Sequence, residues 1–116
     1  MSMPQIFTLS LVEIVGDFAL KKFANEGGLS NLIFGVIGYI GVIMLLIISL
    51  QGSTVLLVNN AWDGMSSLME SFAAYFILGE KFKHNSQYVG IILIMLGMYL
   101  LKIPWVKDKY FTMPQI

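Results

Sequence analysis

The chain has 116 residues, of which 57% are hydrophobic and 12% are charged, and its formal net charge is zero. Soluble domains are usually about half apolar and about a quarter charged, so this composition indicates a membrane protein. All seven basic residues are lysines. Without arginine the chain lacks the bidentate phosphate contacts typical of nucleic-acid binders, and we expect no nucleic-acid partner. The absence of cysteine excludes disulfides and thiolate metal sites.

Four apolar stretches are each close to the roughly 20 residues that a helix needs to cross about 30 Å of hydrocarbon. We therefore expect an all-α, multi-pass integral membrane protein with one four-helix domain over residues 1–116. The first stretch lacks the positive segment and cleavage site of a signal peptide, so we expect it to be retained. The predicted helices cover residues of about 5–24, 31–50, 54–78 and 88–103.

Turn signals separate these helices. Residues 25–28 form one turn and residues 79–87 a charged loop, with Ser30 the expected N-cap of the second helix and Pro104 the end of the fourth. The short connection at residues 51–53 predicts that the second and third helices are antiparallel neighbours. The two sides of the membrane then carry three and four lysines, a balance that suits a chain inserting both ways.

The third stretch carries far more polar groups than a membrane span normally does. Asn59, Asp63, Ser66 and Glu70 follow one another at i, i+4, i+7 and i+11, which predicts one polar stripe on a helix. Carboxylates within an apolar span are costly unless they face water, a ligand or a partner, so we expect the stripe to line a polar cavity. Alternatively, Asn59 could bond to another helix, Ser66 could bond back to its own helix, and Glu70 could pair with a lysine.

The first stretch contains two acids one helical turn apart. Glu13 lies at mid-span, and Asp17 follows on the same face. Two such carboxylates in a low dielectric cannot both ionise cheaply, so at least one should hold a proton near neutral pH. A carboxyl of this kind can exchange its proton for a cation, which is the chemistry of a coupled antiporter. Asp17 could instead form a structural salt bridge with Lys21, whereas Glu13 has no lysine one turn away.

Aromatic and glycine residues add two further expectations. Tyr39, Trp62 and Phe18 could offer π faces to an organic cation, although isolated aromatics more often pack or anchor an interface. The mid-helix hydroxyl of Tyr39 needs a partner, which favours the cavity. Small residues let membrane helices approach closely, so we expect two packing faces, unless the glycines only reflect their frequency in membrane helices. These faces are Gly35, Gly38 and Gly41 in the second helix, and Gly90 and Gly97 in the fourth.

Signals for other chemistry are absent. The single histidine, His84, lies in a charged loop, so the sequence predicts no metal site. No nucleophile–base pair, glycine-rich phosphate loop or serine hydrolase motif is present. We therefore expect neither an enzyme nor a cofactor. Residues 3–6 and 113–116 both read Met-Pro-Gln-Ile, and we have no physical account of this repetition.

A set of residues over about 5–104 matches one family pattern: Glu13-Ile14-Val15-Gly16 with Lys21, Tyr39, Ala61-Trp62-Asp63-Gly64, and Gly90 with Gly97. On these residues the chain resembles the small multidrug resistance transporters, and Gly79-Glu80 resembles the repeat ending of the wider drug/metabolite transporter superfamily. The resemblance implies a four-helix subunit that works as a homodimer, often antiparallel, with Gly90 and Gly97 as dimerisation glycines. The first-helix glutamates of both subunits would form a shared site for protons and a cationic substrate, exposed alternately to the two sides.

The chain departs from the family pattern at four positions. Asn59 replaces a tyrosine, Asp17 replaces a small neutral residue, and Asp63 and Glu70 are additional acids. A dimer would gather more negative charge than one monovalent hydrophobic drug requires. We therefore expect a more polar or polyvalent cation, such as a polyamine or a guanidinium compound.

Two functions other than antiport also fit the sequence. The same acids could line the pore of a cation-conducting oligomeric channel, which would pass ions continuously. Alternatively, the chain could be a non-catalytic assembly or lipid-carrier subunit, which would give no flux and would leave the four acids unexplained.

Overall fold

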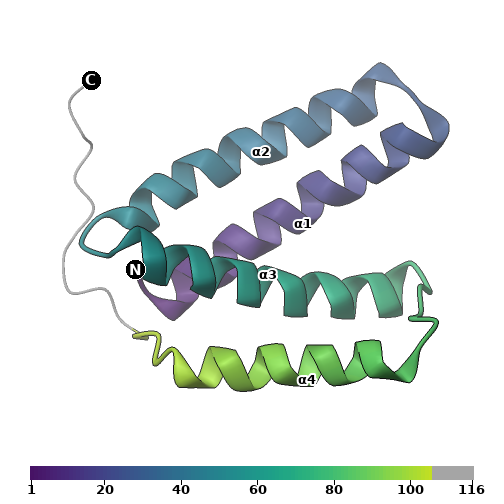
Figure 1. Ribbon diagram of the computed structural model, residues 1–116. Coiled ribbons are helices and arrows are strands. Elements are labelled where there is room, and N and C mark those ends of the chain that lie inside the picture. Colours follow the sequence, from purple (N-terminus) through teal and green to yellow (C-terminus); the bar gives the residue numbers. More distant parts are fainter. Residues whose placement is uncertain (106–116) are drawn as a thin grey trace.

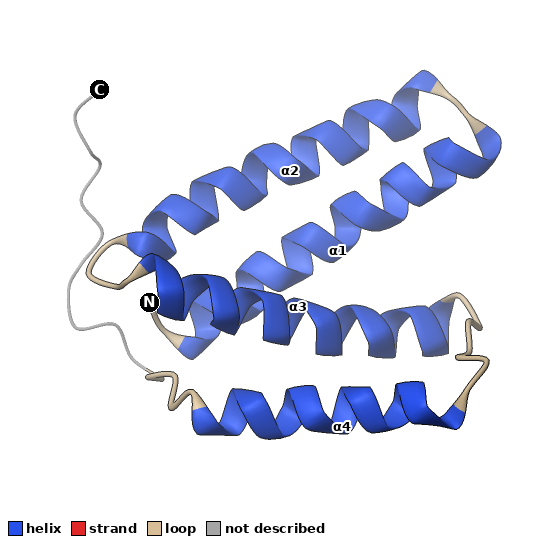
Figure 2. Cartoon of the chain, viewed as in Figure 1, coloured by secondary structure: helices blue, strands red, loops and turns tan. Residues whose placement is uncertain are grey.

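In a computed structural model, residues 1–105 are described, and they form four α-helices joined by short connections (Figures 1 and 2). No strand occurs in these residues, so the predicted all-α fold is confirmed. The predicted helices agree with the observed ones to within a few residues at each end. Residues 113–116, the second Met-Pro-Gln-Ile, lie outside the described part. The helices are α1 (Met3–Glu26), α2 (Leu29–Leu50), α3 (Val55–Ile77) and α4 (Asn85–Leu100).

The ends of the helices follow from local sequence. Ser2 caps α1, because its side chain accepts the backbone N–H of Gln5, and Thr54 caps α3 in the same way. Gly27 and Gly28 have φ angles of 74° and 98°, a region that glycine adopts without strain. They complete the turn in two residues, so α2 begins at Leu29 with Gly28 as its N-cap. The predicted N-cap at Ser30 is therefore wrong.

α4 ends three residues before the predicted boundary. Leu101 is its C-cap, and Lys102 turns the chain out of the helix with a φ of 51°. The backbone carbonyl of Pro104 then accepts the N–H of Met3 at 2.7 Å, which ties the end of α4 to the start of α1.

Glycines bring α1 and α2 into close contact. A Cβ atom added at Gly38 would lie 2.9 Å from the Cα of Gly16, which is backbone and cannot move aside. At Gly41 it would lie 3.1 Å from a side-chain atom of Val12, and at Gly35 it would collide with Leu20. The packing face predicted for the second helix is therefore confirmed, and its partner is α1.

The order of packing differs from the predicted one. Both α2 and α3 pack mainly against α1, whereas α2 and α3 diverge from their shared connection and make little contact with each other (Figure 1). The prediction that α2 and α3 are close neighbours is thus wrong. The glycine face of α2 fits the surface of α1, and the four-residue connection at 51–54 only fixes where α3 begins.

Buried residues gather at one end of the subunit, where α1 begins, α2 meets α3 and α4 ends. We call this the core end. The charged amino group of Met1 donates to the Ser53 Oγ there at 3.0 Å. The opposite end, which holds the connections at residues 27–28 and 78–84, is mostly exposed, and we call it the loop end. The core consists of Met1, Ile6, Leu9, Val42, Val58, Ala61 and Ile103.

Two helices, α1 and α2, are long and apolar enough to cross a membrane. α3 has 23 residues but carries the polar stripe, and α4 is apolar but has 16 residues. Large apolar side chains cover the outside of the subunit, and α4 buries none of its residues. So much exposed apolar surface is typical of a chain that meets lipid or another protein.

Candidate functional site

Glu13 lies in the middle of α1 with its carboxylate turned toward α3. Its Oε2 accepts two hydrogen bonds from that helix: the Trp62 Nε1 donates at 2.6 Å and the Ser66 Oγ at 2.9 Å. The side chain is half-buried. Ser66 thus bonds across to α1 and not back to its own helix. These two hydrogen bonds fix the position of the Glu13 carboxylate between α1 and α3.

Asp17 lies one turn further along α1 and is held by the second helix. The Tyr39 hydroxyl of α2 donates a hydrogen bond to the Asp17 Oδ1. This is the polar partner that we expected the mid-helix tyrosine to need. Lys21 does not pair with Asp17; it forms an ion pair with Glu80, in the connection between α3 and α4. The alternative of a structural Asp17–Lys21 salt bridge is therefore wrong.

Glu70 of α3 completes a group of three acids, which we call the carboxylate cluster. One carboxylate oxygen from each of Glu13, Asp17 and Glu70 lies within 4.8 Å of the others, and all three side chains are half-buried. Two unit charges at this distance repel by about 3 kcal/mol at an effective dielectric constant of 20. A proton or a cation bound between the three carboxylates would reduce this repulsion.

The side of α3 that meets α1 differs from the stripe predicted by helical spacing. Val58, Trp62, Ser66 and Glu70 are spaced four residues apart, and this row faces α1: Val58 is fully buried and the other three reach the two acids of α1. A row of residues at i, i+4, i+8 is inclined to the helix axis, and helices that cross at an angle pack along such rows.

Two residues of the predicted stripe consequently lie apart from the carboxylate cluster. Asn59 and Asp63 are exposed. Asp63 instead lines a groove between α3 and α4, together with Gly97 and Met98. The neighbouring Asn60 bonds back to the Leu56 carbonyl of its own helix at 2.7 Å.

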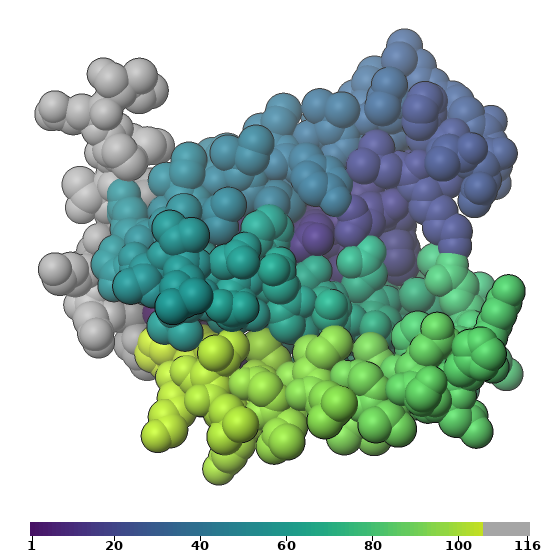
Figure 3. All heavy atoms as spheres, viewed as in Figure 1, coloured from purple at the N-terminus to yellow at the C-terminus, as the bar shows by residue number. Residues whose placement is uncertain are grey.

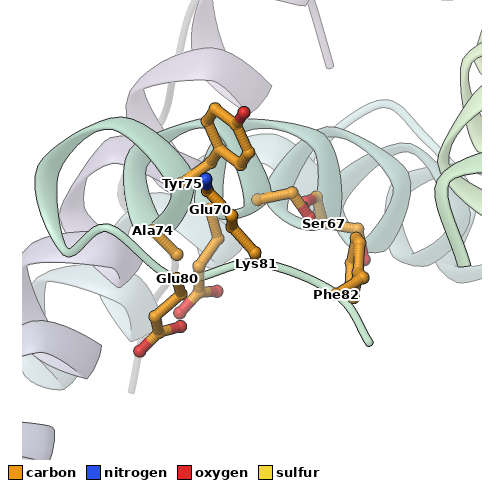
Figure 4. A pocket seen from close by; sticks show the side chains of 8 residues that line it. Ser67, Glu70, Ala74, Tyr75, Glu80, Lys81 and Phe82 are labelled. Atoms are coloured by element: carbon orange, nitrogen blue, oxygen red, sulfur yellow. The ribbon is translucent and has the colours of Figure 1, made fainter. Parts of the chain in front are cut away.

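A pocket opens beside the cluster at the loop end, with a volume of about 330 Å³. Figure 4 shows Glu70 in this pocket beside side chains from the α3–α4 connection. In the space-filling view, the surface is hollowed between the end of α1 and this connection (Figure 3). We did not predict these loop residues as part of the site, although the charged run Gly-Glu-Lys-Phe-Lys-His was visible in the sequence. The lining residues are Ser67, Glu70, Ser71, Ala74, Tyr75, Glu80, Lys81 and Phe82.

Three carboxylates this close could also ligate a hard cation, a possibility that the sequence prediction of no metal site did not include. Calcium takes six to eight oxygen ligands, however, and the cluster offers three side chains. The arrangement is therefore an acidic site built from α1 and α3.

No protein-family model matches the chain, and no curated protein matches it either. Its function is therefore inferred from its own residues and their geometry.

Proposed function

We propose that the protein is a proton-coupled antiporter of small organic cations that works by alternating access. The observation that carries this proposal is the carboxylate cluster, in which acids from α1 and α3 converge. Acids inside membrane helices are rare, and they mark proton relays and ion pathways. A cluster of carboxylates that can bind either a proton or a cation is suited to exchange one for the other, which is what an antiporter does.

The proposal takes all four helices as membrane spans. α3 is long enough to cross; its Glu70 turns toward α1, and its Asp63 lies in the groove toward α4. The 16 residues of α4 reach about 24 Å, so a local thinning of the bilayer or help from Leu101 to Trp105 would complete the span. The resemblance to the small multidrug resistance transporters agrees with this arrangement and with the position of Glu13.

We further propose that the working unit is a homodimer, which the family resemblance implies is antiparallel. α4 buries none of its residues, and a Cβ atom added at Gly90 or Gly97 would meet nothing within 4 Å. Small residues on an open face are where a second membrane helix can approach closely. A dimer would also shield the exposed apolar side chains of α4.

The extra acids favour a polar or polyvalent substrate. Glu13 has two hydrogen-bond donors of its own, whereas Asp17 and Glu70 add up to two further negative charges within 4.8 Å. A polyamine has two or more separated charges, and a guanidinium compound has several N–H donors. Either cation would pair with more of these carboxylates than a lipophilic monovalent dye.

Purified protein in liposomes with a pH gradient tests the proposal. We expect uptake of a linear diamine or a guanidinium compound to release protons in a fixed ratio, and Glu70→Gln to reduce the preference for the diamine about tenfold or more. Asp63→Asn is the matched control, because Asp63 is exposed and outside the cluster. Uptake of lipophilic dyes without any uptake of polar cations would contradict the substrate class, and unitary ion currents would indicate a channel.

The dimer surface has its own test. Leucine at Gly90 or Gly97 should weaken self-association about tenfold or more, because overpacking a contact costs about 1–3 kcal/mol. The subunit itself should keep its helix content, since both positions face open space within the chain. Analytical ultracentrifugation in detergent measures the dissociation constant, and Ser30→Leu, in an exposed position of α2, is the control. Unchanged association of both α4 variants would exclude this face.

A further inference from the structure

The loop end is held together differently from the core end. At the core end, buried side chains and the Met3–Pro104 backbone hydrogen bond join the start of α1 to the end of α4. At the loop end, an ion pair between Lys21 of α1 and Glu80 of the α3–α4 connection bridges the two helix pairs, and both side chains are about half exposed. An exposed ion pair is a weak restraint, so this end of the subunit can open more easily.

The pocket beside this ion pair has the chemistry of a cation site. Glu70 and Glu80 contribute two carboxylates and Lys81 one ammonium group, so negative charges outnumber positive ones in the lining. Figure 4 shows both carboxylate groups directed to the same side of the pocket. Tyr75 and Phe82 contribute aromatic side chains, whose faces attract cations and whose bodies are apolar. Its volume of about 330 Å³ lies within the range of small-molecule sites.

The pocket also leads to the carboxylate cluster. Glu70 belongs to both, because it lines the pocket and lies within 4.8 Å of the acids of α1. Glu80 likewise belongs to both the pocket and the ion pair. A cation in the pocket would therefore touch one carboxylate of the cluster and one member of the bridge.

We propose that this pocket is the access vestibule through which a small organic cation with an apolar body reaches the carboxylate cluster, and that the Lys21–Glu80 ion pair gates it. The inference rests on the proposed function. A cation that approaches Glu80 competes with Lys21 for the same carboxylate, so its arrival loosens the bridge that it must pass. Gly79, with a φ of 69°, begins the connection in a conformation that favours glycine and lets the chain turn sharply away from α3.

The absence of native cysteine allows a direct test by thiol labelling. Ser71 lines the pocket, and Ser71→Cys is a small change. In proteoliposomes, we expect a quaternary-ammonium methanethiosulfonate reagent to label this cysteine about tenfold faster than a sulfonate reagent of similar size, because an acidic pocket concentrates cations. Glu70→Gln should reduce that ratio.

The gate is tested in the Ser71→Cys variant by breaking and restoring the Lys21–Glu80 ion pair. Lys21→Met and Glu80→Gln should each raise the labelling rate by a neutral reagent about two- to fivefold, the factor expected from an exposed ion pair. The charge swap Lys21→Glu/Glu80→Lys should return the rate toward that of the wild type. Lys22→Met removes the adjacent lysine and should leave the rate unchanged.

The outcomes separate the two proposals. Equal labelling by the cationic and anionic reagents would overturn the vestibule, and a Lys21→Met rate equal to the Lys22→Met rate would overturn the gate. Thermal unfolding in detergent shows whether each variant is folded. If a single substitution prevents folding, the charge swap serves as a second variant for the same test. If labelling follows the expected pattern but no cation is exchanged, the proposed transport function is wrong and the vestibule stands.

Discussion

Replacing Glu13 by glutamine is expected to lower proton-coupled cation exchange by about 100-fold or more. The side-chain amide oxygen of glutamine can still accept the hydrogen bonds that Trp62 and Ser66 donate to the Glu13 Oε2. What the substitution removes is the negative charge and the ability to bind and release a proton. Loss of a buried charged partner typically costs about 2–5 kcal/mol, which corresponds to a factor of roughly 30 to several thousand.

Two further variants separate charge from position in this experiment. Glu13→Asp keeps the charge but withdraws it by one methylene group, and Trp62→Phe keeps the carboxylate but removes one of its donors. Both should retain measurable exchange, with a smaller loss than Glu13→Gln. Proton release and uptake of the cation are measured together in proteoliposomes. Exchange that persists in Glu13→Gln at more than about a tenth of the wild-type rate would assign the coupling to another group of the cluster.

Replacing Gly38 by alanine is expected to destabilise the subunit by about 1–3 kcal/mol, the usual cost of overpacking. The added methyl group would lie 2.9 Å from the Gly16 Cα and 3.2 Å from its backbone nitrogen. Backbone atoms cannot rotate out of the way as a side chain can, so α1 and α2 must separate. Because Asp17 follows Gly16 and Tyr39 follows Gly38, the same separation should lengthen the Tyr39–Asp17 hydrogen bond.

Glycines in other surroundings provide a graded control. At Gly41 the new methyl group meets only a side-chain atom of Val12, at 3.1 Å, so Gly41→Ala should cost less than Gly38→Ala. At Gly90 it meets nothing within 4 Å, and alanine should stabilise the helix by up to about 1 kcal/mol. Unfolding by titration with a denaturing detergent, followed by circular dichroism, ranks the three variants. If Gly41→Ala proved less stable than Gly38→Ala, the close backbone contact of α1 and α2 would be contradicted.

The sequence predicted those features that local patterns determine. Apolar stretches, turn residues and the proline after the fourth stretch placed all four helices to within a few residues. The glycine spacing in α2 also predicted a packing face. Which helix would meet that face was not predictable, because it depends on the shape of α1, and the short turn at residues 51–53 wrongly suggested α3.

The site was predicted only in part, for a geometric reason. Glu13, Asp17 and Glu70 were each singled out as acids in apolar surroundings, and the structure brings all three together. Helical spacing alone also placed Asp63 on the same stripe, but the contact between α1 and α3 follows an inclined row that leaves Asp63 in the groove toward α4. The crossing angle between two helices cannot be predicted from the sequence of either helix alone.

The carboxylate cluster and its hydrogen-bond donors come from α1, α2 and α3, and α4 contributes none of the polar side chains described there. In the proposed antiporter, the dimer surface on α4 and the acids that exchange protons would therefore belong to different parts of the chain. Mutations in α4 could change which subunit this one assembles with while the acids stay as they are. A gene duplication followed by changes in α4 alone would thus be enough to produce two chains that prefer each other and share one chemistry.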